Sequence, residues 1–346
     1  MPNDPPSLPP EYAPQEAVWL SWPTDNPEHW GGAKHDIIRA KFAEIAAAIS
    51  RFEPVRINAE TRDHDSILAD CRRAGAAPER IELFDHPHND VWCRDHGPVF
   101  VRRPDGGLAV TDWEFNAWGE KFPPWDLDNE IPRRIAGALG LPRIATGMVL
   151  EGGAIEVNGP GQLLATEAVL LNPNRNPRLS RAAIEEKLRA FLGATEILWL
   201  ARGIEGDDTD GHIDDLARFA SDTTIVASTA PDPASPNHAT LAENRARLTN
   251  FLTPAGRPFD VVDLPLPDPC EIPGWRLPVL PASYVNFLIL NGAVLVPSFQ
   301  QPRNDDRARS ILAELFPDRE ILPIDCLDLV QEGGALHCIS MQQPLI

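Results

Sequence analysis

The sequence predicts an α/β protein in which five ββαβ units form a closed, pseudo-symmetric ring. The first observation is a regular alternation of turn signals and short apolar runs, in the order hairpin, helix, strand. The second is a repeated motif, because Glu-Gly-Gly-Ala followed by an aliphatic residue occurs at 151–155 and again at 332–336. A five-position echo indicates a duplicated structural unit. An open α/β sheet is the alternative that the same pattern permits.

Four β-hairpins are predicted where strand-like runs flank a short turn. The strongest signal is Asn291-Gly292, since both residues tolerate the positive φ of a two-residue hairpin turn. The predicted strand pairs are 99–103 with 108–115, 154–157 with 162–166, 216–220 with 224–228, and 284–290 with 293–297.

A helix is predicted after each hairpin, from apolar residues spaced three or four positions apart. These residues are Ile131, Ile135 and Leu139; Ile184, Leu188 and Phe191; Leu241, Leu248 and Phe251; and Ile311, Leu312 and Leu315. Strand-like runs at 196–200, 259–264 and 320–324 follow three of the helices. Each unit therefore runs hairpin, helix, strand.

The fifth unit is predicted to be split across the two termini. It combines strands at 17–22 and 55–59 with a C-terminal strand at 335–340. A helix whose apolar face carries Ile37, Ile38, Phe42, Ile45 and Ile49 joins the first two strands. Residues 1–346 thus form a single domain. The Pro-rich segment 265–281 is expected to be a long surface loop, either a lid or an insertion.

Composition excludes several classes of function. The net charge of −20 disfavours nucleic-acid binding and favours the approach of a cationic ligand. No apolar run approaches ~20 residues, so no membrane span is predicted. Residues 1–14 are Pro-rich and lack the features of a signal peptide. The five cysteines include no CxxC pair, which favours a reducing cytoplasm over a disulfide framework.

Polar residues recur where the predicted units begin. They are Asp95, Glu151, His212 and Asp214, with Cys338 in the split unit. In a closed ring these positions all face the central axis. Each residue alone has a structural explanation, such as an ion-pair residue for Asp95, a turn cap for Glu151 or a buried apolar side chain for Cys338. Their joint placement favours catalysis.

The residue types indicate attack on a guanidinium carbon. A thiol beside an imidazole is a usual arrangement for covalent attack, because the thiolate is the nucleophile. Three nearby carboxylates would raise the pKa of the thiol, which makes sense if the substrate is itself a cation. A planar guanidinium offers paired N–H donors that match carboxylates.

Other patterns carry less weight. The run Asp-His-Pro-His-Asn-Asp at 85–90 resembles metal ligands, but no further ligand has suitable spacing. A calcium-like loop at 206–211 lacks the acids that an EF-hand needs, with Gly206 and Ala217 at its first and twelfth positions. Neither pattern therefore predicts a metal site. The aromatic-rich stretch 116–119 is expected either to wall a pocket or to pack in the core.

The chain resembles the agmatine deiminases, and more broadly the bacterial-type peptidylarginine deiminase family of guanidino-modifying, pentein-fold enzymes. The resemblance covers nearly the whole chain, from 16–23 to 337–344. Its matching stretches are 90–98, 115–119, 150–153, 171–177, 211–214, 282–287 and the segment around Cys338. It implies a five-bladed α/β propeller, a catalytic domain without cofactor, and assembly as a homo-oligomer.

The resemblance also implies roles for individual residues. Cys338 would attack the guanidinium carbon and form a thiouronium, and His212 would serve as general acid and then general base. Asp95 and Asp214 would hold the guanidinium nitrogens. Trp92 and Glu151 would contribute to the substrate pocket. Agmatine would yield N-carbamoylputrescine and ammonia.

Three positions depart from the family pattern: Asp210 replaces a common Asn, Glu332 begins the usual Gly-rich run, and His96 replaces a common Thr. An extra acid at Asp210 would suit an amine tail and repel a carboxylate, which favours agmatine over arginine. Alternatives remain open: a deiminase of peptidyl-arginine or another small guanidino compound, an amidino-transferring enzyme, or a non-catalytic polyamine binder.

Overall fold

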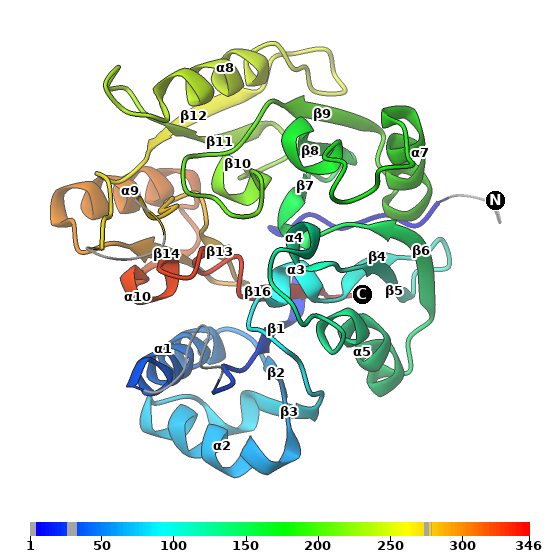
Figure 1. The fold of residues 1–346 in the computed structure, drawn as a ribbon, viewed down its shortest axis with the longest axis vertical. Helices are drawn as coiled ribbons and strands as arrows, with labels where there is room; N and C mark the ends of the chain where they lie inside the picture. The colour runs from blue at the N-terminus through cyan, green and yellow to red at the C-terminus, as the bar shows by residue number, and fades with distance from the viewer. Residues whose placement is uncertain (1–4, 26–32, 273–276, 278) are drawn as a thin grey trace.

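The computed structural model describes residues 5–25, 33–272, 277 and 279–346. Within this part of the chain, the strands form five separate sheets. Figure 1 shows the sheets arranged around a common centre, with the longer helices on the outside. The α/β ring of five units that the sequence predicts is therefore confirmed.

Four blades share one topology, in which the first two strands are antiparallel and a helix leads to a parallel third strand. The first has β4 (Val99–Arg102), β5 (Leu108–Glu114), α5 (Ile131–Leu139) and β6 (Arg143–Val149). The second has β7 (Ile155–Val157), β8 (Gln162–Thr166), α7 (Arg181–Leu192) and β9 (Glu196–Leu200). The third has β10 (Ala217–Phe219), β11 (Thr224–Thr229), α8 (His238–Leu248) and β12 (Asp260–Pro265). The fourth has β13 (Leu288–Ile289), β14 (Ala293–Ser298), α9 (Pro302–Leu315) and β15 (Glu320–Asp325).

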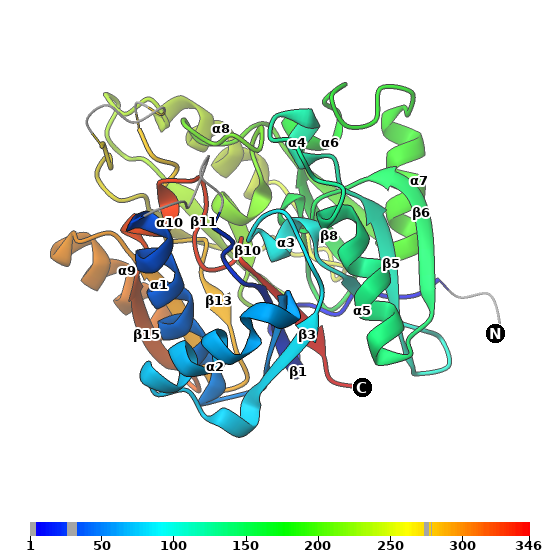
Figure 2. The ribbon, with the colours of Figure 1, turned by 60° about the horizontal axis from the view of Figure 1, so that its bottom comes forward.

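The fifth blade joins the two ends of the chain, as expected. The C-terminal strand β16 (Ser340–Pro344) pairs antiparallel with β1 (Gln15–Ser21), and β1 pairs parallel with β2 (Val55–Ala59) after α1 (Ala33–Ser50). The sequence pattern missed α2 (His64–Arg73) and the parallel strand β3 (Ile81–Asp85), which make this blade four-stranded. Figures 1 and 2 show α1 and α2 lying side by side.

Two predicted strands were wrong in position, and both errors lie at the ring centre. The C-terminal strand begins at Ser340, because residues 335–339 form the turn that carries Cys338. The strand expected at 284–290 is reduced to Leu288–Ile289, because 284–287 form a turn that presents Asn286. The apolar residues of both segments are typical of a strand. In the structure these segments are buried turns that place Cys338 and Asn286.

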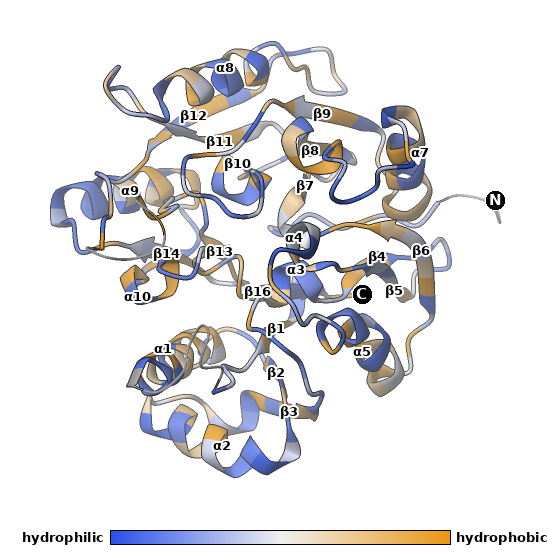
Figure 3. Ribbon diagram, viewed as in Figure 1, coloured by the Kyte–Doolittle hydropathy of each residue, from blue (hydrophilic) through white to orange (hydrophobic). Residues whose placement is uncertain are grey.

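The helices cover the blades with their apolar faces inward. On α2 the buried residues are Ile67 and Cys71, and on α9 they are Ala308 and Leu312. Figure 3 shows mostly hydrophilic residues along both helices. Among the helices that the structure describes, none combines the length and apolar character needed to cross a membrane.

The Pro-rich segment 265–281 leaves β12 at Pro265 and contains no further strand or helix where it is described. Residues 273–276 and 278 of this expected lid or insertion lie outside the described residues.

Candidate active site

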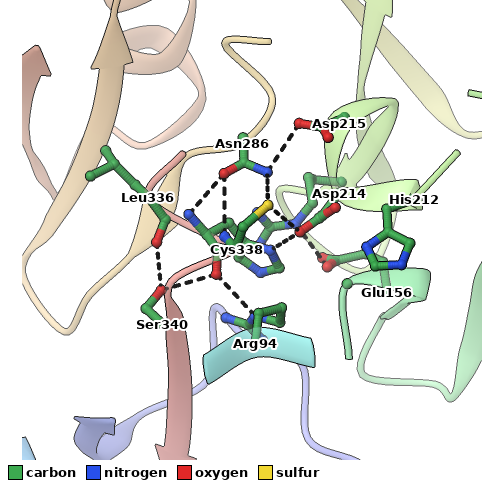
Figure 4. Close-up of polar contacts among 12 residues, drawn as sticks. Arg94, Glu156, His212, Asp214, Asp215, Asn286, Leu336, Cys338 and Ser340 are labelled. Atoms are coloured by element: carbon green, nitrogen blue, oxygen red, sulfur yellow. Dashed lines mark hydrogen bonds and ion pairs between the residues drawn. The ribbon is translucent and has the colours of Figure 1, made fainter. Parts of the chain in front are cut away.

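Cys338 lies in the turn between α10 (Leu327–Val330) and β16, and its side chain is buried. The Asn286 side-chain amide lies 3.0 Å from the Cys338 Sγ, and an Asp214 carboxylate oxygen lies 3.6 Å from it. Figure 4 shows both contacts. Asn286 also accepts hydrogen bonds from the backbone N–H groups of His337 and Cys338. The amide therefore fixes both the turn and its thiol.

The repeated Glu-Gly-Gly-Ala motif has a steric origin. A Cβ atom at Gly334 would lie 2.5 Å from the Trp92 ring and 2.8 Å from the Cys338 Cβ. A Cβ atom at Gly153, the matching position of the first copy, would lie 2.6 Å from His212 Nδ1. In both copies the third residue must be Gly because a functional side chain takes up the space.

Asp95 is held in one orientation by two donors. It belongs to the short helix α3 (Cys93–His96), and its carboxylate accepts from the Gly153 N–H and from the Trp118 indole, both at 2.9 Å. Its Oδ1 also lies 3.6 Å from His212 Nδ1. Burial raises the pKa of Asp95, although the charge of His212 opposes this shift. The carboxylate is thus fixed while still coupled to the imidazole.

His212 is positioned through its backbone. Its N–H donates to the Asp207 carboxylate and to the Thr209 hydroxyl, both at 3.1 Å. Among the described residues, neither ring nitrogen of His212 has a hydrogen-bond partner. Burial lowers the pKa of His212, but the charges of Asp95, Asp214 and other carboxylates outweigh it, so the net shift is upward. The ring is suited to carry a proton that it can transfer.

The pKa values of the adjacent residues Asp214 and Asp215 are shifted in opposite directions. Burial acts to raise the pKa of Asp214, but a hydrogen bond from His337 and the charge of that ring lower it below its ordinary value. Burial and the neighbouring charge of Asp214 raise the pKa of Asp215 well above its ordinary value. Asp214 is therefore the stronger acid of the pair, and Asp215 holds its proton more tightly.

The surroundings of Cys338 disfavour its thiolate. Burial, followed by the charges of Asp214, Asp215 and Asp95, raises the pKa of this thiol well above its ordinary value. This is the direction that the sequence predicts for a thiol among carboxylates. A bound cation would offset those charges and favour the thiolate.

A cavity with aromatic walls and several acids opens above the thiol. Its lining is formed by Asp90, Trp92, Asp95, Trp118, Phe122, Asp208, Thr209, Glu332, Gly333, Gly334 and Cys338. The aromatic side chains suit the faces of a planar cation, and the acids suit its charge. Trp118, in the stretch expected either to wall a pocket or to pack in the core, is buried and lines this cavity.

The predicted site residues are distributed in three ways. Trp92, Asp95 and Cys338 line the cavity. His212 and Asp214 lie behind this lining, in contact with Asp95 and Cys338 respectively. The remaining two, Glu151 and Asp210, are not part of the lining and are described next.

Glu151 and Asp210 share a cation instead of facing the cavity. Arg175 forms an ion pair with both carboxylates, and Lys121 lies 2.7 Å from the second Asp210 oxygen. The backbone oxygens of Asp208 and Thr209 accept from Lys121 and Arg175. Sequence spacing cannot show these cations, because Arg175 lies 24 positions from Glu151 and 35 from Asp210, and Lys121 lies in another blade than Asp210. In this structure the acid nearest the substrate space on this turn is Asp208.

Sequence reasoning missed three further polar residues of the site. They are Asp207, Asn286 and His337. The only available signal was the position of His337 directly before Cys338. Asn286 and Asp207 lie far from Cys338 in sequence, so only the fold brings them close.

One cluster in the described residues has the ligand spacing of a metal site. The carboxylate and thiol atoms of Asp214, Asp215 and Cys338 lie within 4.8 Å of one another. The His-rich run 85–90 is not part of it, since His86 bonds to Asn58 and His88 to backbone oxygens. A negatively charged cluster of this kind also suits a guanidinium.

Residues 7–344 match the sequence model of the Porphyromonas-type peptidyl-arginine deiminases. The chain belongs to this family. It is 38% identical to the agmatine deiminase of Pseudomonas syringae pv. tomato, across 97% of this chain and 95% of that protein. The family resemblance expected from the sequence is thus confirmed.

Solved structures agree with this family membership. The agmatine deiminase of Enterococcus faecalis is 33% identical, with a TM-score of 0.90 over 98% of this chain and 96% of that one. A Cys-to-Ser variant of the C. jejuni agmatine deiminase with substrate bound is 30% identical, with a TM-score of 0.87 over 98% and 96%. The likeness confirms the predicted pentein-type fold.

Proposed function

We propose that this chain hydrolyses agmatine to N-carbamoylputrescine and ammonia through a covalent thiouronium on Cys338. The observation that carries the proposal is the convergence of a thiol, an imidazole and two carboxylates on one aromatic-walled, acid-lined cavity. The similarity to named agmatine deiminases along nearly the whole chain supports the same substrate.

In the first half-reaction, Asp95 and Asp214 hold the guanidinium nitrogens and align the central carbon with the sulfur. The positive charge of the substrate lowers the pKa of the thiol, which releases its proton to solvent. The sulfur attacks the carbon, and His212 protonates one nitrogen. The C–N bond to that nitrogen breaks, ammonia leaves, and the thiouronium remains.

In the second half-reaction, neutral His212 removes a proton from water. The water oxygen attacks the thiouronium carbon, and the C–S bond breaks. The electron pair of that bond returns to sulfur, the remaining hydroxyl proton passes to the sulfur and restores the thiol, and the product carries a ureido group. No step needs an oxidant or a cofactor, and none is assigned.

The acids at the cavity favour a substrate with a cationic tail. Asp90, Asp208 and Glu332 lie in the lining, and Glu332 stands where the family usually has Gly. Asp210 would act on the tail indirectly, because its cations hold the backbone carbonyl oxygens of Asp208 and Thr209. Glu151, on the other side of Arg175, would support the same arrangement.

The test is release of ammonia and ureido product from agmatine, L-arginine and an arginyl peptide in parallel. We expect equal release of both products from agmatine and little release from L-arginine, which carries a carboxylate. Release from another guanidine alone would overturn the substrate but keep the chemistry. Ligand binding without turnover by the wild type would favour a polyamine or guanidine binder. Diversion of product by added glycine or lysine would favour an amidino-transferring enzyme. A homo-oligomeric state and a cytoplasmic location remain predictions.

A further inference from the structure

His337 bridges two buried carboxylates beneath the thiol. Its Nδ1 lies 2.7 Å from Asp214 Oδ2, and its Nε2 lies 2.7 Å from Glu11 Oε2. All three side chains are at most 2% exposed. The imidazole thus connects the carboxylate beside Cys338 to an acid in the N-terminal segment.

The geometry requires both ring nitrogens to donate. An ionised carboxylate only accepts hydrogen bonds, and a neutral imidazole has a single N–H. Burial acts to raise the pKa of Glu11, but the charges of Arg218 and His337 hold it well below its ordinary range. The pKa of Asp214 is also lowered. A ring that donates to both carboxylates carries two N–H groups and therefore a positive charge.

That charge balances the buried network around it. Glu11 pairs with Arg94 and Arg218, and Arg218 also pairs with Glu156. Three acidic side chains, Glu11, Glu156 and Asp214, therefore lie against Arg94, Arg218 and protonated His337. Burial raises the pKa of Glu156, although the charge of Arg218 opposes this shift. Loss of the imidazolium charge would leave one buried negative charge without compensation, which is costly.

The bridge also determines which oxygen of Asp214 remains for a ligand. Oδ2 is occupied by His337, whereas Oδ1 has no hydrogen-bond partner among the residues that the structure describes. A rigid acceptor already in place costs no reorganisation when a cation binds.

We propose that His337 is a positioning residue that keeps Asp214 ionised and oriented so that its carboxylate receives the guanidinium. The inference rests on the proposed function for its substrate. It adds a role for a residue that contacts Asp214 and Glu11 and does not line the cavity. The charged and titratable groups that bear on His337 and Asp214 are Glu11, Arg94, Asp95, Glu156, Asp207, His212, Asp215, Arg218 and Cys338.

Two substitutions test the hydrogen bonds of His337 to Asp214 and to Glu11 separately. The amide nitrogen of His337→Asn takes the place of Nδ1 and can still donate to Asp214. The amide nitrogen of His337→Gln takes the place of Nε2 and can still donate to Glu11. Both remove the positive charge. We expect kcat/KM to fall roughly 10-fold in His337→Asn and on the order of 10²-fold in His337→Gln.

The pH profile distinguishes positioning from a general loss of structure. Without the His337 charge, burial of Asp214 is less opposed and its pKa rises. The acid limb of kcat/KM should therefore move to higher pH in both variants, and further in His337→Gln. The matched control is His86→Gln, which removes another buried imidazole that bonds to Asn58 in the fifth blade. This control should leave the acid limb unchanged.

A readout independent of turnover separates this inference from the substrate assignment. A haloacetamidine carries a planar cation, and a haloacetamide is its neutral counterpart. Alkylation at Cys338, measured by mass spectrometry, should be faster with the cationic reagent in the wild type. This preference should fall in His337→Gln, whether or not agmatine is turned over. Equal losses in the Asn and Gln variants, with an unchanged pH profile and reagent preference, would overturn the proposal. Unfolding midpoints identify any variant that fails to fold, and the Asn variant then carries the comparison.

Discussion

Gly153 leaves the space that the His212 ring occupies, because a Cβ atom there would lie 2.6 Å from Nδ1 and 2.7 Å from Asp95 Oδ1. The backbone N–H of Gly153 also donates to Asp95. One residue of the second blade thus sets the distance between the imidazole and a carboxylate of the first. This explains why the repeated motif keeps its second Gly.

Substitution of Gly153 by Ala should reduce activity severely. The added methyl group must displace His212 or Asp95, and a shift of about 1 Å in a catalytic group costs roughly 10²-fold. Gly137→Ala is the matched control, because a Cβ atom at this position of α5 meets nothing within 4 Å. The control should keep full kcat/KM and gain roughly 0.5–1 kcal/mol of stability. Equal activity of the two variants would refute the steric explanation.

Cys338→Ser should abolish turnover while the protein stays folded and binds agmatine, because a serine hydroxyl is a much weaker nucleophile in this site. Calorimetric titration with agmatine measures the binding. The control is Cys270→Ser, since that thiol contacts Asp268 and Gln301 outside the cavity. Residual turnover close to wild type in the Cys338 variant would remove the covalent mechanism.

Neighbouring acids should respond differently to removal of charge. Asp214→Asn removes an ionised carboxylate that faces the substrate, so kcat/KM should fall on the order of 10²-fold. Asp215→Asn replaces a carboxyl group whose pKa burial and the charge of Asp214 raise, and the Asn286 contact can persist. The decrease in kcat/KM of the Asp215→Asn variant should be far smaller. Steady-state kinetics on both variants, with agmatine, tests the assignment, and a reversed order would contradict it.

Asp208 should contribute more to agmatine binding than Asp210. Asp208 lines the cavity, whereas Asp210 is paired with Lys121 and Arg175. Asp208→Asn should raise the KM for agmatine about 10-fold, equivalent to ~1.4 kcal/mol, with little effect on a guanidine that lacks an amine tail. Asp210→Asn should affect both substrates alike, because it loosens the turn rather than a tail contact. An amine-specific effect at Asp210 alone would restore the original sequence-based prediction.

The His96–Asp128 pair should make stability depend on alkaline pH. Burial acts to lower the pKa of His96, but Asp128 and other contacts raise it from 6.5 to about 10. A raised pKa means that the folded state binds this proton more tightly than the unfolded state. The contribution is therefore complete below pH 6.5 and is lost as pH rises to about 10.

Urea unfolding of the wild type and His96→Thr between pH 6 and 10 measures this contribution. The difference in unfolding free energy should shrink as pH rises across that interval. A constant difference would show that the charge of Asp128, 3.5 Å from His96 Nδ1, does not stabilise a protonated His96. Thr is the residue that the family often has here, so the substitution should be tolerated.

Much of the fold could be predicted because the two periodicities are local. Alternating and helical spacings reveal strands and helices without knowledge of their neighbours. The prediction failed at 335–340 and 284–290, where apolar side chains are buried in turns that serve the thiol. It also missed α2 and β3, which extend the split blade beyond the repeated unit.

The sequence by itself determined the five-unit order and the split blade, and it predicted Cys338, His212, Asp95 and Asp214 as site residues. These follow from residue type, spacing and internal repetition, which are properties of the chain. Only the tertiary structure decided that Arg175 forms ion pairs with Glu151 and Asp210. Only the tertiary structure likewise places His337 in the buried ion-pair network beneath the thiol. The physical reason is that ion pairing and desolvation depend on distances between blades, and those distances are not encoded in the local pattern.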